Sequence, residues 1–159
     1  MSAEAVRAWI AQHAPDLEII TVDGSTATVA TAAAALDVEP GQIAKSLAVR
    51  AGNHVFLLVT RGDSRLDNRK CKAEFGDRPR MLGPDETLAV TGHPVGGVCP
   101  FGLANPLPVY LDVTLQPFAT VFPAGGSLNT SIRTAPQRLF ELVAERWVDL
   151  CTLPDDAGR

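Results

Sequence analysis

The most restrictive feature of this sequence is a pair of apolar runs in its first half. Residues 43–51 (IAKSLAVRA) and 54–62 (HVFLLVTRG) are rich in aliphatic and β-branched side chains, and the turn pair Gly52-Asn53 separates them. Runs of this length and composition are typical of strands that are covered on both faces. The sequence therefore predicts two consecutive strands in the centre of a sheet.

The rest of the chain interleaves helices and strands irregularly. Apolar spacing, Pro and Gly stops, and the N-caps Ser2 and Thr134 predict helices over residues 2–14, 31–38, 67–75, 84–90 and 135–145. Alternating β-rich runs predict a hairpin over 17–30 around Asp23-Gly24, and strands over 109–113, 119–123, 129–134 and 147–151. Because no regular βαβ units result, we expect a mixed α/β fold with one curved sheet, curled toward a barrel and flanked by helices. At 159 residues, one domain spanning residues 1–159 is expected.

The composition is that of an ordinary globular protein. Hydrophobic residues make up 46% and charged residues 20%, which argues against disorder, fibrous repeats and small disulfide scaffolds. The first residues lack a secretory signal and no apolar stretch is long enough to span a bilayer, so we expect a cytoplasmic protein with no membrane partner. The three cysteines form no CxxC pair and the histidines have no cysteine at ligand spacing. We therefore expect reduced thiols and neither a metal nor another cofactor.

Basic residues are concentrated in one segment of an otherwise acidic chain. The formal net charge is −4, which by itself argues against a nucleic-acid partner. Residues 61–80, however, contain seven of the fourteen Lys and Arg residues. Such a segment can bind phosphates, or it can be an exposed helix with ion pairs such as Lys70 with Glu74 at i, i+4. The candidate phosphate-binding residues are Arg61, Arg65, Arg69, Lys70 and Lys72.

A loop dense in glycine and proline spans residues 91–108 (TGHPVGGVCPFGLANPLP). Glycines allow close approach of a ligand, and consecutive backbone N–H groups in such a loop can bind an oxyanion or a carbonyl. The alternative is a surface connection built from turn residues. Neither a GxGxxG fingerprint nor a P-loop is present, which excludes the usual phosphate-binding motifs.

Lys45 is unusual because lysine is scarce: the chain has three lysines and eleven arginines. It lies inside the first apolar run, and strand alternation places it on the same face as Ile43 and Leu47, the face expected to be buried. A charge there is costly unless it reaches a cleft or a partner. The alternative is a surface lysine whose stem alone is covered.

Cys99, within the loop, has two interpretations. A thiol near backbone donors could be a nucleophile, in which case iodoacetamide would inactivate the protein. The sequence places no His–Asp or His–Asn pair to activate it, and His93 could approach it only through a tight fold. A small residue lining a pocket is the favoured interpretation.

Together these segments resemble the YbaK/EbsC family, free-standing relatives of the editing domain inserted in bacterial prolyl-tRNA synthetases. The resemblance covers about residues 20–150. It rests on Ala44-Lys45-Ser46-Leu47, RGDSRLDNRKCKAEFG, TGHPVGGVCPFGL, VYLDV and FPAGGSLNTSIR. The most specific element is the GxxxP loop, here residues 96–100, downstream of the lysine.

The resemblance implies trans-editing, in which the ester between a wrong amino acid and the terminal ribose of a tRNA is hydrolysed. It implies a mixed α/β fold that works without a metal, with mischarged tRNA as the partner and an aminoacyl-tRNA synthetase as a further one. It assigns catalysis to Lys45, Gly96 and Gly97, with the lysine near either the terminal phosphate or the amino acid. It assigns substrate binding to Val98, Cys99, Pro100 and Asn129.

The sequence is compatible with alternatives in substrate, function and oligomeric state. Several relatives carry serine or threonine where Cys99 stands, so the amino acid removed could be cysteine, alanine, serine, threonine or a small unnatural residue. The alternative function is a module of the same fold that binds tRNA or a small ligand without hydrolysis, and a monomer and a homodimer are equally compatible with the sequence. No residue is a convincing general base, so water oriented by the substrate is the expected nucleophile.

Overall fold

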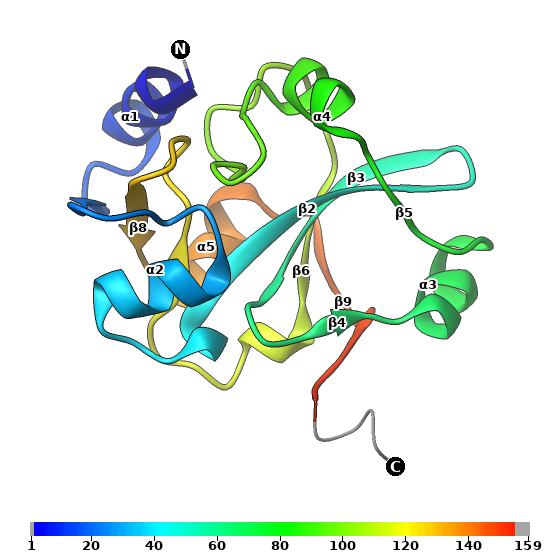
Figure 1. Ribbon diagram of the computed structural model, residues 1–159. Helices are drawn as coiled ribbons and strands as arrows, with labels where there is room; N and C mark the ends of the chain where they lie inside the picture. The colour runs from blue at the N-terminus through cyan, green and yellow to red at the C-terminus, as the bar shows by residue number, and fades with distance from the viewer. Residues whose placement is uncertain (1, 155–159) are drawn as a thin grey trace.

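The computed structural model describes residues 2–154 and has a mixed α/β architecture, as predicted (Figure 1). The helices are α1 (Ser2–His13), α2 (Val29–Leu36), α3 (Asn68–Phe75), α4 (Pro84–Thr91) and α5 (Pro136–Val143), with short 3-10 helices η1 (Pro40–Gln42) and η2 (Val113–Leu115). The strands are β1 (Glu18–Thr21), β2 (Ile43–Ala51), β3 (His54–Arg61), β4 (Arg65–Leu66), β5 (Arg80–Met81), β6 (Val109–Asp112), β7 (Phe122–Pro123), β8 (Thr130–Arg133), β9 (Arg146–Val148) and β10 (Cys151–Thr152).

The two apolar runs form the central hairpin of the main sheet. β2 and β3 pair antiparallel over their full length, and the strand order is β5-β2-β3-β6-β9 with β7 also beside β2. β1 with β8, and β4 with β10, form two further two-stranded sheets. The predicted central position of both strands is confirmed. Curling toward a barrel is not, because the pairing among residues 2–154 leaves the main sheet open.

The outer edge of β2 is covered by two different strands with a gap between them. β7 pairs with Ile43 and Ala44, whereas β5 pairs with Val49 and Arg50. Between these contacts, residues 45–48 face no partner strand in the described chain on this edge. This unpaired stretch of a central strand is the feature that positions the site.

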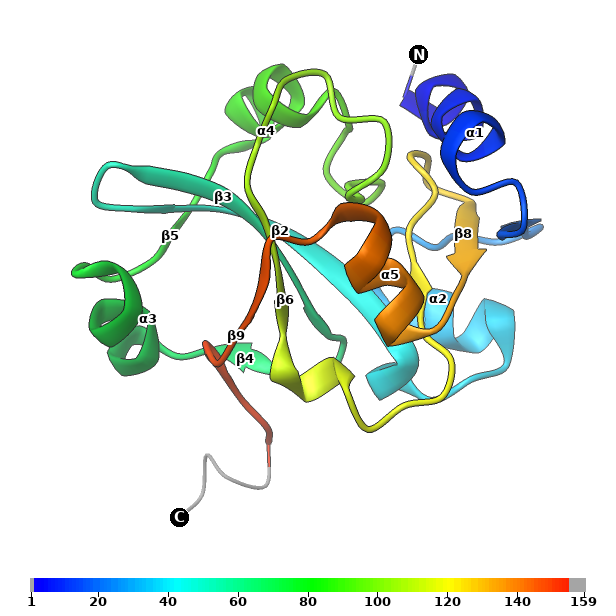
Figure 2. The ribbon, with the colours of Figure 1, turned by 180° about the vertical axis from the view of Figure 1, so that it is seen from behind.

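Alternation along β2 and β3 separates the core into two layers. Ala44 and Ala48 pack with Leu57 and Val59 in the larger apolar cluster on one face. Val49 and Ala51 pack with Phe56, Leu58 and neighbouring side chains on the other. α5 lies behind the sheet in Figure 1 and in front of it in Figure 2, so it covers one of these faces. Each residue of β2 is thereby assigned to a face by its position.

Three sequence-based expectations about local structure are wrong. Ser2 lies inside α1 instead of preceding it as a cap, and its hydroxyl is hydrogen-bonded to His93 Nδ1. The segment 17–30 is not a hairpin: β1 pairs with the distant β8, and Thr28 instead caps α2 through a reciprocal capping box with Thr31. The spacing of Thr28 and Thr31 allows a capping box that favours the start of a helix, and this preference outweighs the weak turn signal of Asp23-Gly24. Thr134 is not the cap of the last helix, because Ala135 occupies that position without a side-chain hydrogen bond.

Candidate active site

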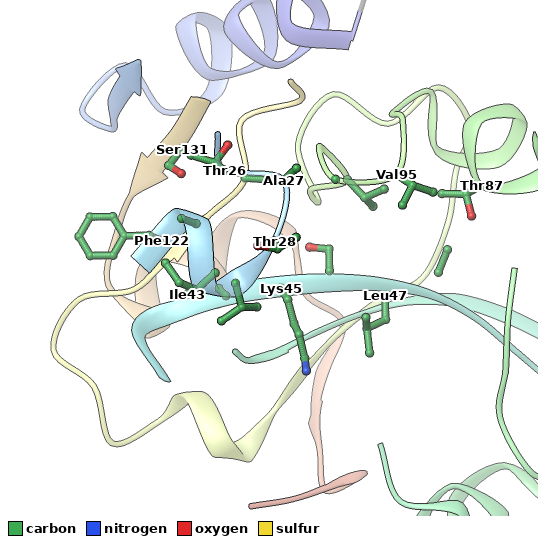
Figure 3. A pocket seen from close by; sticks show the side chains of 18 of the residues that line it. Thr26, Ala27, Thr28, Ile43, Lys45, Leu47, Thr87, Val95, Phe122 and Ser131 are labelled. Atoms are coloured by element: carbon green, nitrogen blue, oxygen red, sulfur yellow. The ribbon is translucent and has the colours of Figure 1, made fainter. Parts of the chain in front are cut away.

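A cavity of about 310 Å³ opens beside the unpaired stretch of β2 (Figure 3). Its walls come from segments that are far apart in sequence. They are residues 26–29, Ala32, residues 43–48, Met81, Leu82, Thr87, Val95, Gly96, Val98, Phe122, Ala124 and Ser131. Most of these side chains are small, so the cavity suits a small polar ligand with an apolar part.

Ser46, in the middle of the unpaired stretch, brings polar groups to the cavity. Its hydroxyl is buried and is the one buried side-chain polar atom in the described chain that lacks a hydrogen-bond partner. The Leu82 N–H donates to the Ala48 carbonyl on this edge, so alternation turns the Ser46 backbone N–H and C=O toward the same edge. Buried polar groups are rarely left without partners in native proteins. This exception makes the Ser46 hydroxyl a candidate contact for a ligand.

The GxxxP segment lies across the cavity from β2. Gly96 and Val98 line the cavity, and the backbone of Gly96 has a positive φ of 93° that favours glycine. Gly97 is buried behind them and packs closely on the Gly126-Ser127 backbone. A Cβ atom added to Gly97 would lie 2.9 Å from the Ser127 backbone nitrogen. The Gly97 N–H, one of the expected donors, is used within the loop because it donates to the Pro94 carbonyl. The N–H groups of Gly96 and Val98 have no partner among residues 2–154.

Lys45 also lines the cavity, but its ammonium points elsewhere. Figure 3 shows its side chain leaving β2 on the side opposite Thr26, Ser131 and Val95. Its Nζ donates to the Ser64 carbonyl at 2.6 Å. Half-burial is the main cause that lowers the pKa of Lys45 from its ordinary value of 10.5. The structure therefore places the lysine charge at the border of the cavity, away from the GxxxP segment.

Cys99 lies behind the loop rather than in the cavity lining. It is fully buried, and its Sγ is 3.7 Å from His93 Nε2 and 3.7 Å from the Phe101 carbonyl oxygen. His93 is itself buried between the Phe101 carbonyl and the Ser2 hydroxyl of α1. Burial raises the pKa of Cys99 to about 12, so the thiol stays protonated near neutral pH and is a poor nucleophile. Cys99 does approach His93 closely, but the contact is buried in the core and leaves the Cys99 thiol protonated.

The remaining two candidates for substrate binding, Pro100 and Asn129, also lie outside the cavity lining. Pro100 is buried next to Cys99. Asn129 is exposed, and its side-chain oxygen accepts a hydrogen bond from Ser127. Pro100 ends the GxxxP loop itself, whereas Asn129 follows the Gly126-Ser127 turn on which Gly97 packs.

The basic segment is divided between paired and unpaired side chains. Arg61 pairs with Asp63, and Lys70 pairs with Asp149. The i, i+4 pair expected between Lys70 and Glu74 is wrong, because Glu74 instead pairs with Arg146 of β9. Of the five candidate phosphate-binding residues, three make no ion pair within the described chain and are exposed: Arg65, Arg69 and Lys72. None of the five candidates lines the cavity.

The cavity wall formed by residues 26–29 was not found from the sequence. This segment was predicted as a strand, and only its capping role beside α2 brings it against β2. Ser46 gave no separate signal either, because one serine beside an unusual lysine has no distinguishing spacing. Across residues 2–154, no cluster of three metal-ligating side chains occurs and no helix could cross a membrane.

Comparison with known proteins places the chain in a family. Residues 23–142 match the family model of the aminoacyl-tRNA editing domain. The chain is 45% identical over 153 residues to an uncharacterized protein, YwhH, of Bacillus subtilis (strain 168), covering 95% of this chain and 98% of that protein. It is 32% identical over 116 residues to a proline–tRNA ligase of Kosmotoga olearia, covering 72% of this chain and 20% of the ligase.

Solved structures agree with the sequence comparisons. A crystal structure described as "a putative trans-editing enzyme for prolyl tRNA synthetase" superposes with a TM-score of 0.87 at 34% identity, covering 95% of this chain and 97% of that chain. The similarity therefore extends over the whole cavity and not only over the GxxxP segment. The chain belongs to the aminoacyl-tRNA editing domain family.

Proposed function

We propose that this protein is a trans-editing hydrolase that removes a small, wrongly attached amino acid from the 3′ end of a tRNA. The observation that carries the proposal is the Ser46 hydroxyl, buried without a partner in a cavity that the backbone of Gly96 and Val98 also lines. The family assignment supports the reaction class, and the cavity supports the size of the amino acid.

In the proposed reaction, water adds to the ester carbonyl carbon and produces a tetrahedral oxyanion. The bond to the terminal ribose oxygen then breaks, and that oxygen takes a proton while the amino acid leaves. The free N–H groups of Gly96 and Val98 are the available donors for the oxyanion, and one well-placed donor is worth about 3 kcal/mol of barrier. Ser46 holds the amino acid through its hydroxyl. An ester needs less activation than an amide, so orienting the water is sufficient.

Lys45 and the unpaired basic residues serve the tRNA side of the substrate in this proposal. The Lys45 ammonium lies at the border of the cavity and away from the GxxxP loop, which favours a contact with the terminal phosphate over one with the carbonyl. Arg65 lies close enough to affect the pKa of Lys45. Charge concentrated here allows phosphate binding by a chain whose net charge is −4.

The function is tested with tRNAs charged with labelled cysteine, alanine, serine, threonine or proline. We expect release of one or more small amino acids well above the rate without protein, and slower release of the correctly matched amino acid. If no charged tRNA loses its amino acid faster than in buffer, the hydrolase proposal is wrong. Saturable, salt-sensitive tRNA binding without release would instead support a binding module.

Ser46→Ala separates a functional hydroxyl from a structural one. Removing a buried hydroxyl without a partner should leave the free energy of unfolding unchanged or raise it by about 1 kcal/mol. The same change should lower kcat/KM for deacylation by about tenfold, because a hydrogen bond to the substrate is lost. The control is Thr21→Val, which removes an exposed hydroxyl of β1 outside the cavity lining. Reduced stability with unchanged kcat/KM would contradict the role given to Ser46.

A further inference from the structure

Large apolar side chains are exposed around the mouth of the cavity. In the described chain, Met81, Leu88, Val95 and Leu128 are the large hydrophobic residues with at least half of their surface exposed. Met81 and Val95 line the cavity. Leu128 lies against Gly96, where a side chain would come within 2.9 Å of its Cδ2. Three of the four therefore gather at one opening, and exposed apolar groups gathered in this way mark binding surfaces.

The proposed substrate dictates what must face this opening. The ester joins the amino acid directly to the terminal ribose, so an amino acid inside the cavity leaves the ribose and its adenine base at the mouth. The planar face of a base packs favourably on apolar and polarizable side chains, and the thioether of Met81 is of this kind. The basic side chains fit a different part of the substrate, because none of Arg61, Arg65, Arg69, Lys70 and Lys72 lines the cavity.

We propose that Met81, Val95 and Leu128 form an apolar seat for the adenine base of the terminal nucleotide. This inference rests on the proposed function, and it adds the residues that contact the nucleotide next to the ester. The seat is made by β5, the loop before the GxxxP segment and the turn before β8, so it surrounds the cavity from more than one side. The apolar seat holds the base by packing, so the polar groups inside the cavity remain available to the amino acid.

The test measures binding rather than hydrolysis. One probe is adenosine carrying alanine at the 3′ position through a non-hydrolysable amide, and the other is the same molecule without the base. The wild-type protein should bind the first probe at least about tenfold more tightly, because the base buries apolar surface on the three side chains. The double variant with Met81→Ser and Leu128→Ser should lose this preference. Leu88→Ser, which changes an equally exposed leucine outside the lining, should keep it.

The outcomes distinguish this proposal from the proposed function. Equal binding of both probes by the wild-type protein, or a preference that survives in the double variant, would overturn the apolar seat. Loss of the preference in Leu88→Ser as well would also overturn it, because the effect would then not depend on the cavity mouth. The binding preference can be measured even if charged tRNA is not hydrolysed, so failure of the hydrolase proposal is recognised separately.

Discussion

Gly97→Ala should lower kcat/KM for deacylation by about 100-fold, the loss expected when reacting groups are displaced by about 1 Å. A methyl group on Gly97 would lie 2.9 Å from the Ser127 backbone nitrogen and 3.0 Å from the Gly126 carbonyl carbon. Because these contacts are with backbone, the loop must move as a unit. The neighbouring Gly96 and Val98, which line the cavity, would move with it. Deacylation of charged tRNA by the purified variant measures the effect.

Gly24→Ala is the matched control for this substitution. A methyl group at Gly24 meets no other atom within 4 Å, and its backbone does not have a positive φ. The control should therefore retain wild-type kcat/KM and stability. If Gly97→Ala remains folded and as active as the Gly24→Ala control, the GxxxP segment does not act through its position beside the cavity.

Lys45→Ala should lower kcat/KM by at least about tenfold while the fold is retained, because a charge that contacts the substrate is lost. Burial lowers the pKa of Lys45 from its ordinary value of 10.5, so the group loses its charge at a lower pH than an exposed lysine does. The activity of the wild-type protein should therefore fall as the pH rises through this pKa. Lys45→Ala should lack that alkaline decrease once hydrolysis in buffer is subtracted.

The control for Lys45 is Lys72→Ala, which removes an exposed lysine of α3 that makes no ion pair in the described chain. This variant should retain the alkaline decrease, with at most a small increase in KM. An unchanged rate for Lys45→Ala would remove the lysine from the mechanism. An alkaline decrease that persists in Lys45→Ala would assign the titration to another group.

The central strands and the position of the GxxxP segment were predictable because their signals are local. Apolar runs around Gly52-Asn53 are sufficient to predict β2 and β3, and Gly76 ends α3 in the left-handed conformation expected of a C-terminal glycine. Alternation also placed Lys45 on the same face as Leu47, and Figure 3 shows both side chains leaving β2 on the same side. Such features depend on neighbours along the chain.

The cavity itself depends on contacts that no local signal contains. The gap on β2 exists because β5 and β7, each two residues long, pair with opposite ends of the same edge. Strands this short have no periodicity to detect. The Lys45 hydrogen bond to the Ser64 carbonyl and the burial of Cys99 likewise follow from tertiary packing. The sequence alone therefore identified the GxxxP loop and Lys45 as candidates, but it did not identify the Ser46 hydroxyl.

Under the proposed function, the cavity beside Ser46 hydrolyses an aminoacyl ester and does not merely bind it. Turnover is measured as the number of labelled amino acids released per protein molecule from a mischarged tRNA, with hydrolysis in buffer subtracted. We predict many releases per molecule for the wild-type protein and a strongly reduced rate for Gly97→Ala. Tight binding of the charged tRNA with no release beyond that in buffer would show that the cavity binds the ester without hydrolysing it.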